Sequence, residues 1–276
     1  MGERHSLMKK DIQLIVTDLD GTLIDGKLRV SDQDRQTLDV LKDIGIPVVP
    51  ATGRGLRSAE GVIKNLPLSN YIICFGGAAL FCDEKVIWHT AVGNCLPYYE
   101  ILKQREISNI AVFHEHADGV KDLSLFTPKT AEWAYTLEKY GGEVIRGEKI
   151  PWAASQDLTK MVYFAGLEEL QEVQVKWLEI GTDKHIVLSS DYTLDITHAD
   201  ARKGEATRIL ALEMGISMEN VMAIGDNFND YDLIKEAGFG VAMGTAPDGV
   251  KKIADYVTDS VKESGFSQAV HKFVLG

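Results

Sequence analysis

The sequence predicts an α/β protein in which a parallel-sheet core is interrupted by a separate α+β domain. Short apolar runs at residues 14–16, 46–49 and 221–224 alternate with stretches of helical periodicity, a pattern typical of β-α-β units with buried parallel strands. From about residue 81 to residue 190 this rhythm gives way to short mixed segments. A change of that kind indicates an inserted module of a different class.

Composition excludes several classes of protein. The 276 residues are 45% hydrophobic and 25% charged, as in ordinary globular domains. A net charge of −12 argues against a nucleic-acid backbone or an anionic membrane as the main partner. No apolar run approaches the ~20 residues of a membrane span, and residues 1–10 lack the apolar centre of a signal peptide. We therefore expect a cytoplasmic protein with three reduced cysteines and neither nucleic acid nor membrane as partner. Composition does not give the oligomeric state, for which a monomer or homodimer is expected.

Two carboxylates end the first apolar run. Asp18 and Asp20 follow it directly, and Gly21 and Thr22 come next. Burying two anions there costs several kcal/mol, roughly, unless a cation or strong donors compensate. Ligands of open α/β sheets bind at the carboxyl ends of the strands. The stretch therefore favours a metal-assisted phosphate site over the alternative, a turn with surface charges.

Two later segments carry groups suited to the same chemistry. Thr52 and Gly53 follow the second apolar run, one β-α unit after Asp18. Lys203 stands near the start of a predicted helix that reaches Met214. A cation at a helix N-terminus opposes the helix dipole and needs an anionic partner. Asp18 together with a bound phosphate would supply that partner.

The strand predicted at residues 221–224 ends in another acidic segment. Asp226, Asn229 and Asp230 lie within six residues that begin at Gly225. We expect Asp226 to meet Asp18 across adjacent strand ends. An oxygen-only cage of this kind, completed by water, suits Mg²⁺.

Four segments together resemble the motifs of the haloacid dehalogenase (HAD) superfamily: Asp18-Leu19-Asp20-Gly21-Thr22, Thr52-Gly53-Arg54, Lys203-Gly204 and Gly225-Asp226-Asn227-Phe228-Asn229-Asp230. The layout is similar to that of the Cof-like phosphatases, subfamily IIB with a C2-type cap. This resemblance implies a Rossmann-like parallel-sheet core with an inserted α+β cap domain. The expected divisions are core at residues 1–82, cap at 83–190 and core again at 191–276.

The resemblance also implies a role for each motif residue. Asp18 is expected to be the nucleophile, and Asp20 the general acid/base. Asp20 must then hold a proton, which burial and neighbouring carboxylates would favour. The expected phosphate-binding residues are Leu19, Thr52, Gly53, Lys203 and Asn229. The expected Mg²⁺ ligands are Asp18, the backbone carbonyl of Asp20, and Asp226, with Asp230 orienting a metal-bound water.

The function implied is Mg²⁺-dependent hydrolysis of a small phosphomonoester through an aspartyl-phosphate. The partner would be a small phosphorylated metabolite, either a sugar phosphate or a phosphorylated cofactor. A phosphomutase and a catalytically silent binding protein stay open as alternatives. Two positions depart from the Cof pattern, because Gly76 and Thr245 stand where Asn is usual.

The inserted region is expected to contain strands at residues 86–88, 110–113, 160–164 and 185–188, and helices at 98–104, 130–140 and 167–180. The core would resume with a strand at 193–197. His114 and His116 would face the same way on a strand, but ordinary packing is favoured over a metal site because a third ligand is lacking. The aromatic residues here, Tyr163, Trp133, Trp152 and Trp177, are expected to form the cap's core.

Overall fold

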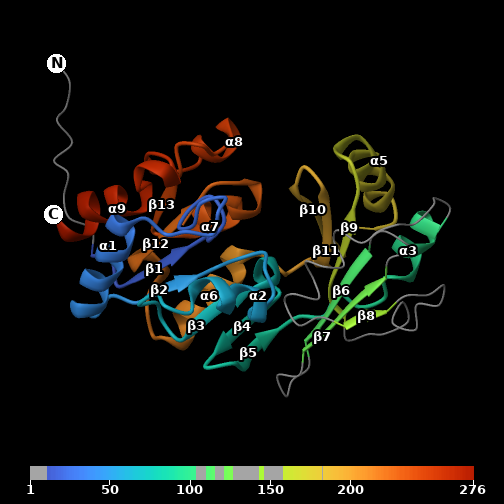
Figure 1. Ribbon diagram of the computed structural model, residues 1–276, viewed down its shortest axis with the longest axis horizontal. Helices are drawn as coiled ribbons and strands as arrows, with labels where there is room; N and C mark the ends of the chain where they lie inside the picture. The colour runs from blue at the N-terminus through green and yellow to red at the C-terminus, as the bar shows by residue number, and fades with distance from the viewer. Residues whose placement is uncertain (1–10, 104–109, 116–120, 127–142, 146–157, 182) are drawn as a thin grey trace. The chain divides into compact units, whose positions relative to one another are not determined.

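The computed structural model describes residues 11–103, 110–115, 121–126, 143–145, 158–181 and 183–276. The chain, drawn in Figure 1, divides into two compact units. The first unit consists of Met1–Thr52, Val62–Ile73 and Lys203–Gly276, and the second of Gly53–Gly61 and Cys74–Arg202. The chain thus leaves the first unit and returns to it, as an insertion requires.

A five-stranded parallel sheet forms the centre of the first unit, in the order β14-β13-β12-β1-β2. Its strands are β1 (Leu14–Thr17), β2 (Val48–Pro50), β12 (Val221–Gly225), β13 (Phe239–Ala242) and β14 (Tyr256–Val257). In register, Thr17 of β1 lies opposite Ile224 of β12. Since parallel neighbours end at the same edge, the residues that follow these two strands lie together.

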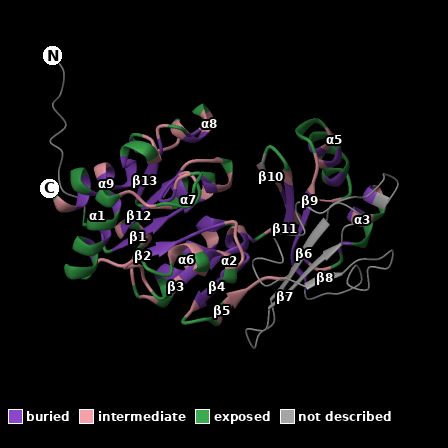
Figure 2. Ribbon diagram, viewed as in Figure 1, coloured by how far each residue is buried: buried purple, intermediate pink, exposed green. Residues whose placement is uncertain are grey.

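Burial explains why these residues form central strands. Every residue of β1 and β12 is buried, as Figure 2 shows in purple for the sheet of this unit. Strands covered on both faces require near-continuous apolar runs. The predicted parallel-sheet core is therefore confirmed.

Helices of the same unit accompany the sheet: α1 (Asp32–Asp43), α6 (Lys203–Glu213), α7 (Tyr231–Glu236), α8 (Asp248–Lys251) and α9 (Gly265–Val270). The helix α1 begins after Ser31, whose hydroxyl accepts a hydrogen bond from the amide of Asp34 at 3.0 Å. The buried carboxylate of Asp34 accepts from the amide and the hydroxyl of Ser267 in α9, at 2.9 and 2.6 Å. These bonds hold α1 against α9, and the two helices lie side by side in Figure 1.

The second unit contains a six-stranded sheet in the order β10-β11-β9-β6-β7-β8. Its strands are β6 (Ile110–Glu115), β7 (Lys121–Phe126), β8 (Glu143–Ile145), β9 (Leu158–Phe164), β10 (Lys184–Ser190) and β11 (Thr193–His198). Most of the helix α2 (Leu56–Ile63) lies in this unit. The unit's described residues also form the helices α3 (Leu96–Lys103) and α5 (Leu167–Leu178). The buried indole of Trp177 donates to the carbonyl of Tyr98 at 3.0 Å and so joins these helices. Trp177 and Tyr163 are core residues, as predicted.

Three shorter strands precede this sheet: β3 (Tyr71–Cys74), β4 (Ala79–Cys82) and β5 (Lys85–His89). The strand β3 meets the end of β2 through an isolated bridge between Ile73 and Ala51. After β3 the backbone of Gly76 has φ +68°. Left-handed backbone favours glycine, and among other residues it favours Asn. The turn geometry thus accommodates Gly76 as well as the Asn usual in Cof-like proteins.

The expectation that the core resumes with a strand at residues 193–197 is wrong. These residues lie in β11, which pairs antiparallel with β9 and β10 in the second unit. Leu194 and Ile196 alternate with Asp195 and Thr197, which is the pattern of an antiparallel strand and not of a buried parallel one. The first unit resumes at Lys203.

Some predictions fall outside the described residues: the helix at 130–140 and the side chains of His114, His116, Trp133 and Trp152. The domain boundaries 1–82, 83–190 and 191–276 also stay a prediction. All three cysteines are free thiols. In the described part of the chain, no helix combines the length and apolar character needed to cross a membrane.

Candidate active site

Asp18 stands at the carboxyl end of β1, an interior strand of the parallel sheet that lies between β12 and β2. Its amide donates to the carbonyl of Ile224 at 2.9 Å, which continues the β1–β12 ladder by one residue. Its side chain is only 6% exposed. Thr52 lies at the same edge, one residue beyond Ala51, whose amide donates to Thr17 at 2.8 Å. The polar ends of three strands therefore converge where the sequence predicts them.

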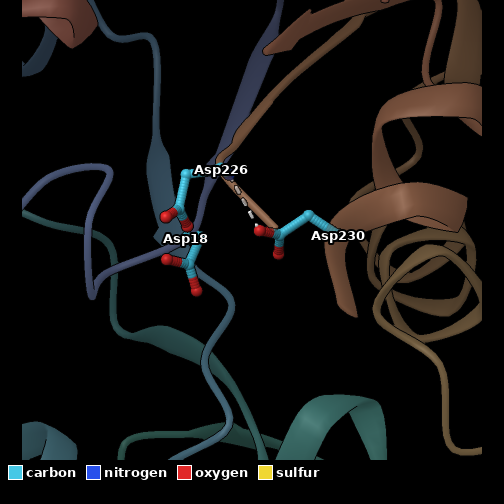
Figure 3. A group of neighbouring side chains, drawn as sticks. All are labelled: Asp18, Asp226 and Asp230. Atoms are coloured by element: carbon cyan, nitrogen blue, oxygen red, sulfur yellow. Dashed lines mark hydrogen bonds between the residues drawn. The ribbon is translucent and has the colours of Figure 1, made fainter. Parts of the chain in front are cut away.

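Three carboxylates gather at this edge. One oxygen each of Asp18, Asp226 and Asp230 lies within 4.8 Å of the others. Figure 3 shows the carboxylates of Asp18 and Asp226 close together, with Asp230 approaching from the following helical turn. The meeting of Asp18 and Asp226 across adjacent strand ends is thus confirmed.

Lys203 supplies the cation of the cluster. Its Nζ atom donates to Oδ1 of Asp18 and to Oδ1 of Asp230, each at 2.6 Å, and the side chain is completely buried. The predicted anionic partner of this helix-start lysine is therefore present. Gly204, the next residue, donates its amide to the carboxylate of Asp232 at 2.9 Å. A Cβ atom at position 204 would lie 3.0 Å from Asp232, which accounts for glycine after the lysine.

Asp230 organises the loop that carries Asp226. Its Oδ2 atom accepts from the amides of Asp226 and Asn227, at 3.0 and 3.2 Å, while Oδ1 is held by Lys203. Both oxygens therefore have protein partners. Asp230 fixes Lys203 and the Asp226 backbone together, which suits a supporting carboxylate better than a direct metal ligand.

The turn after Asp20 supports Asp226 from the other side. The hydroxyl of Thr22 donates to Oδ1 of Asp226 at 3.4 Å. Gly21 has φ +93°, and a Cβ atom there would collide with the carboxylate of Asp226. The glycine is thus required twice, by its backbone conformation and by the close approach of Asp226.

Burial and neighbouring charges shift the protonation of the cluster. Burial raises the pKa of Asp18 well above its usual 3.8; Lys203 opposes this rise, whereas Asp230 and Asp226 add to it. Burial, and then Asp230, raises the pKa of Asp226 to about 7. Burial favours the neutral amine of Lys203, but Asp18 and Asp230 outweigh this effect and raise its pKa above 10.5. When ionised, the three carboxylates therefore carry more negative charge than the single ammonium of Lys203 neutralises.

The charge and the ligand atoms of this cluster indicate whether a metal ion would fit. Among the described residues, three carboxylates face one ammonium, which leaves an excess of negative charge when all are ionised. The ligand atoms are carboxylate oxygens, which suit hard cations such as Mg²⁺. A divalent cation would relieve the repulsion that raises the pKa of Asp18 and Asp226. The residues present therefore fit the metal.

Asp20 differs from expectation in one respect. Its side chain is exposed, so burial of this carboxyl, expected from the sequence, is wrong. The reason is local: Asp20 lies in a turn beyond the buried strand, and the amides of Gly21 and Ile24 bond within that turn. Its role as acid/base and its carbonyl as a metal ligand stay predictions.

The remaining predicted residues occupy different surroundings. Thr52 is 1% exposed and the side chain of Leu19 is fully buried. Gly53 falls in the second compact unit, directly after Thr52 in the chain. Oδ1 of Asn229 is buried and has no hydrogen-bond partner among the described residues, so this side chain has unused capacity beside Asp230. The phosphate-binding role of these residues stays a prediction.

Sequence reasoning missed the support from Asp232. Its bond to the Gly204 amide joins residues 28 positions apart, so no local spacing signals it. The sequence does not indicate the close approach of Gly21 to Asp226 either, because a glycine after two acidic residues predicts only a turn.

Comparison with known proteins agrees with this geometry. The profile of the haloacid dehalogenase-like hydrolase family matches residues 15–270. A relative from Bacillus subtilis strain 168, 5-amino-6-(5-phospho-D-ribitylamino)uracil phosphatase YcsE, is 31% identical over 265 residues, which cover 96% of this chain and 97% of the relative. A phosphoglycolate phosphatase from Methanobrevibacter smithii is 28% identical over 96% of this chain and all of its own length.

Solved structures share the fold. The subclass IIB sugar phosphatase BT4131 superposes with a TM-score of 0.80 at 24% identity, over 95% of this chain and 98% of its own. With the family profile covering nearly the whole chain, these likenesses leave one assignment. The protein belongs to the haloacid dehalogenase-like hydrolase family, in its group of Cof-like phosphatases.

Proposed function

We propose that this protein is a Mg²⁺-dependent phosphatase that hydrolyses small phosphomonoesters through an aspartyl-phosphate on Asp18. One observation carries the proposal: the buried carboxylate of Asp18, at a strand end, lies 2.6 Å from a buried lysine and beside Asp226. A carboxylate in this position is suited to attack a phosphoryl group, because Lys203 and the proposed Mg²⁺ would offset the negative charge of that group.

In the first step, an oxygen of Asp18 attacks phosphorus in line and the ester oxygen departs. Asp20 donates a proton to that oxygen, so the leaving group departs as an alcohol. Lys203 holds Asp18 in the attacking position and offsets negative charge on the phosphoryl oxygens. Thr52, Gly53, Asn229 and the amide of Leu19 bind those oxygens.

In the second step, Asp20 takes a proton from water, and that water attacks phosphorus. The bond between phosphorus and Asp18 breaks, which releases inorganic phosphate and restores the carboxylate. Asp20 is exposed, so it can exchange its proton with solvent between turnovers. Asp230 stays in place throughout, because both of its oxygens are already bonded.

Mg²⁺ would be held by Asp18, Asp226 and the carbonyl of Asp20, and would supply positive charge that favours the ionised nucleophile and the phosphoryl oxygens. Thr22 and Asp230 keep Asp226 in position for this binding. The raised pKa of Asp226, about 7, supports the need for a cation at this place.

The substrate class follows from the relatives. By their names, YcsE acts on a phosphorylated ribitylaminouracil and BT4131 on sugar phosphates. We therefore propose a small phosphorylated metabolite as the substrate, either a sugar phosphate or a phosphorylated cofactor. The expected location in the cytoplasm and the expected monomer or homodimer stay predictions.

The test measures release of inorganic phosphate from sugar phosphates, phosphorylated cofactors and phosphoglycolate, in the presence of Mg²⁺ and in the presence of EDTA. We expect turnover that requires Mg²⁺ and that Asp18→Asn abolishes while the circular dichroism spectrum is unchanged. Turnover that survives complete removal of metal, or that Asp18→Asn retains, would contradict the proposal.

A further inference from the structure

The loop that follows β2 is held at three successive residues. The amide of Thr52 donates to the carbonyl of Ile73 at 2.8 Å, and the carbonyl of Arg54 accepts from the amide of Phe75 at 2.9 Å. Between them, the carbonyl of Gly53 accepts from Nζ of Lys160 at 3.2 Å. Lys160 is thus a side chain from a distant strand, β9, that bonds to the middle of a proposed phosphate-binding segment.

Gly53 needs such a partner more than its neighbours do. It has no side chain, and a Cβ atom built on it would meet nothing within 4 Å. No side-chain contact therefore fixes the backbone at this residue. Glycine also has the widest range of backbone angles, so without a bond to its carbonyl the residue can rotate at small energetic cost.

Lys160 is itself held rigidly. Its side chain is 7% exposed, and Nζ lies 2.5 Å from Oδ2 of Asp195 on the neighbouring strand β11. Burial of such a pair contributes little net stability, because desolvation opposes the attraction between the charges. Oδ1 of Asp195 is also buried, without a hydrogen-bond partner in the described part of the chain. The pair is therefore poorly explained as a device for stability alone.

We propose that Lys160 is a positioning residue for phosphate binding, which rests on the function proposed above. Fixed by Asp195, its ammonium holds the carbonyl of Gly53 and thereby the orientation of the adjoining Thr52–Gly53 peptide. The hydroxyl of Thr52 and the amide of Gly53 are then kept ready for the phosphoryl oxygens. Lys160 acts through the backbone and does not touch the substrate.

The test compares variants at two lysines of one sheet. In Lys160→Met with Asp195→Leu, both charges of the pair are replaced together, so no buried charge is left alone. Lys160→Met alone is the simpler second variant. The matched control is Lys184→Met: Lys184 lies in β10 of the same sheet, is 8% exposed, and pairs with Asp183 at 2.6 Å. Melting temperatures of all variants separate loss of stability from loss of binding.

The first readout is the affinity for inorganic phosphate in the presence of Mg²⁺, measured by calorimetry and as product inhibition. Loss of a charge-assisted hydrogen bond predicts affinity weakened about 10-fold or more in the Lys160 variants, with a matching rise in KM, and no change in Lys184→Met. The second readout is the amide resonance of Gly53 in glycine-labelled protein, identified by its absence in Gly53→Ala. We expect it to shift, and to exchange faster with solvent, only in the Lys160 variants.

Unchanged phosphate affinity and an unchanged Gly53 resonance in the Lys160→Met/Asp195→Leu protein would overturn this inference alone. A melting temperature lowered equally in the Lys160 and Lys184 variants, with phosphate affinity equally weakened, would also overturn it, because the effect would then be structural. A wild-type protein that binds no phosphate and hydrolyses no ester would overturn the proposed function, and this inference with it.

Discussion

Nζ of Lys203 lies 2.6 Å from Oδ1 of Asp18, and both side chains are withdrawn from solvent. The two residues are 185 positions apart, and the fold brings them together because one follows β1 and the other begins α6. A buried lysine that faces two carboxylates neutralises part of a larger negative charge.

Replacement of Lys203 by Met should abolish phosphate release and destabilise the protein. The change leaves Asp18 and Asp230 buried without their ammonium, and a buried pair broken on one side costs about 3–5 kcal/mol. Added Mg²⁺ should raise the melting temperature of Lys203→Met more than that of the wild type, since the cation takes over part of the lost charge.

Lys235→Met is the matched control, because this lysine is exposed in α7 of the same unit. We expect its stability to change by no more than about 0.5 kcal/mol, as for ordinary surface substitutions. Full phosphate release by Lys203→Met would contradict the role given to this residue.

Replacement of Asp20 by Asn should slow turnover by about 10²–10⁴-fold, the usual contribution of a general acid/base. The loss of rate in the first step should depend on the leaving group. An aryl phosphate releases a phenolate that needs little protonation, so its first step should be nearly normal while the second stays slow. Stopped-flow measurement should then show a burst of phenolate that the wild type lacks. Equal losses for alkyl and aryl esters, without a burst, would show that Asp20 is not the base of the second step.

The stability of the metal-free protein should depend on pH through the carboxyl of Asp226. The carboxyl of Asp226 has a pKa of 3.8 when unperturbed and about 7 in the folded state, where burial raises it. Between these values the folded state binds more protons than the unfolded state, so this group makes stability fall as pH rises from about 4 to 7. Mg²⁺ favours the ionised carboxylate and should remove this decline.

The measurement is the melting temperature across this pH range, with EDTA and with Mg²⁺. Binding of Mg²⁺ should also weaken as the pH falls below about 7, because protons compete for Asp226. A melting temperature in EDTA that rises steadily toward pH 7, with Mg²⁺ affinity independent of pH, would contradict the crowded carboxylate cluster.

Gly21→Ala should weaken Mg²⁺ binding. Its φ of +93° disfavours alanine, and the added Cβ atom would displace the carboxylate of Asp226. Strained backbone of this kind costs about 1–3 kcal/mol. Gly26→Ala is the matched control in the same loop, since a Cβ atom there would meet nothing within 4 Å. Calorimetry should show weaker Mg²⁺ binding for Gly21→Ala alone, and equal affinities in the two variants would count against the close approach to Asp226.

Much of the core could be predicted because each strand carries its own signal. The apolar runs before Asp18 and Asp226 require burial on both faces, and the polar residues after them can then lie only at the sheet edge. Lys203 was predictable for a related reason, because a cation at a helix start needs an anion. These inferences depend on local pattern and on one topological rule.

The rest depends on contacts between distant residues. Nothing near Lys160 in the sequence indicates its bond to Gly53, and nothing near Asp232 indicates its bond to Gly204. The strand at 193–197 was assigned to the wrong sheet: its alternating pattern indicates an antiparallel strand, but only the pairing shows that its partners are β9 and β10. The burial of Asp20 was overestimated because a turn residue beside a buried strand can face solvent, whatever its neighbours do.

The most direct test of the central claim is chemical trapping at Asp18. The protein is mixed with Mg²⁺ and an ester that it hydrolyses, and the reaction is quenched during turnover. Borohydride is then added, which reduces an aspartyl-phosphate to homoserine. Peptide mass spectrometry should find homoserine at position 18 only when ester and Mg²⁺ are both present. Homoserine at Asp226 or Asp230, or unmodified Asp18 during rapid turnover that Asp18→Asn sustains equally well, would contradict the account.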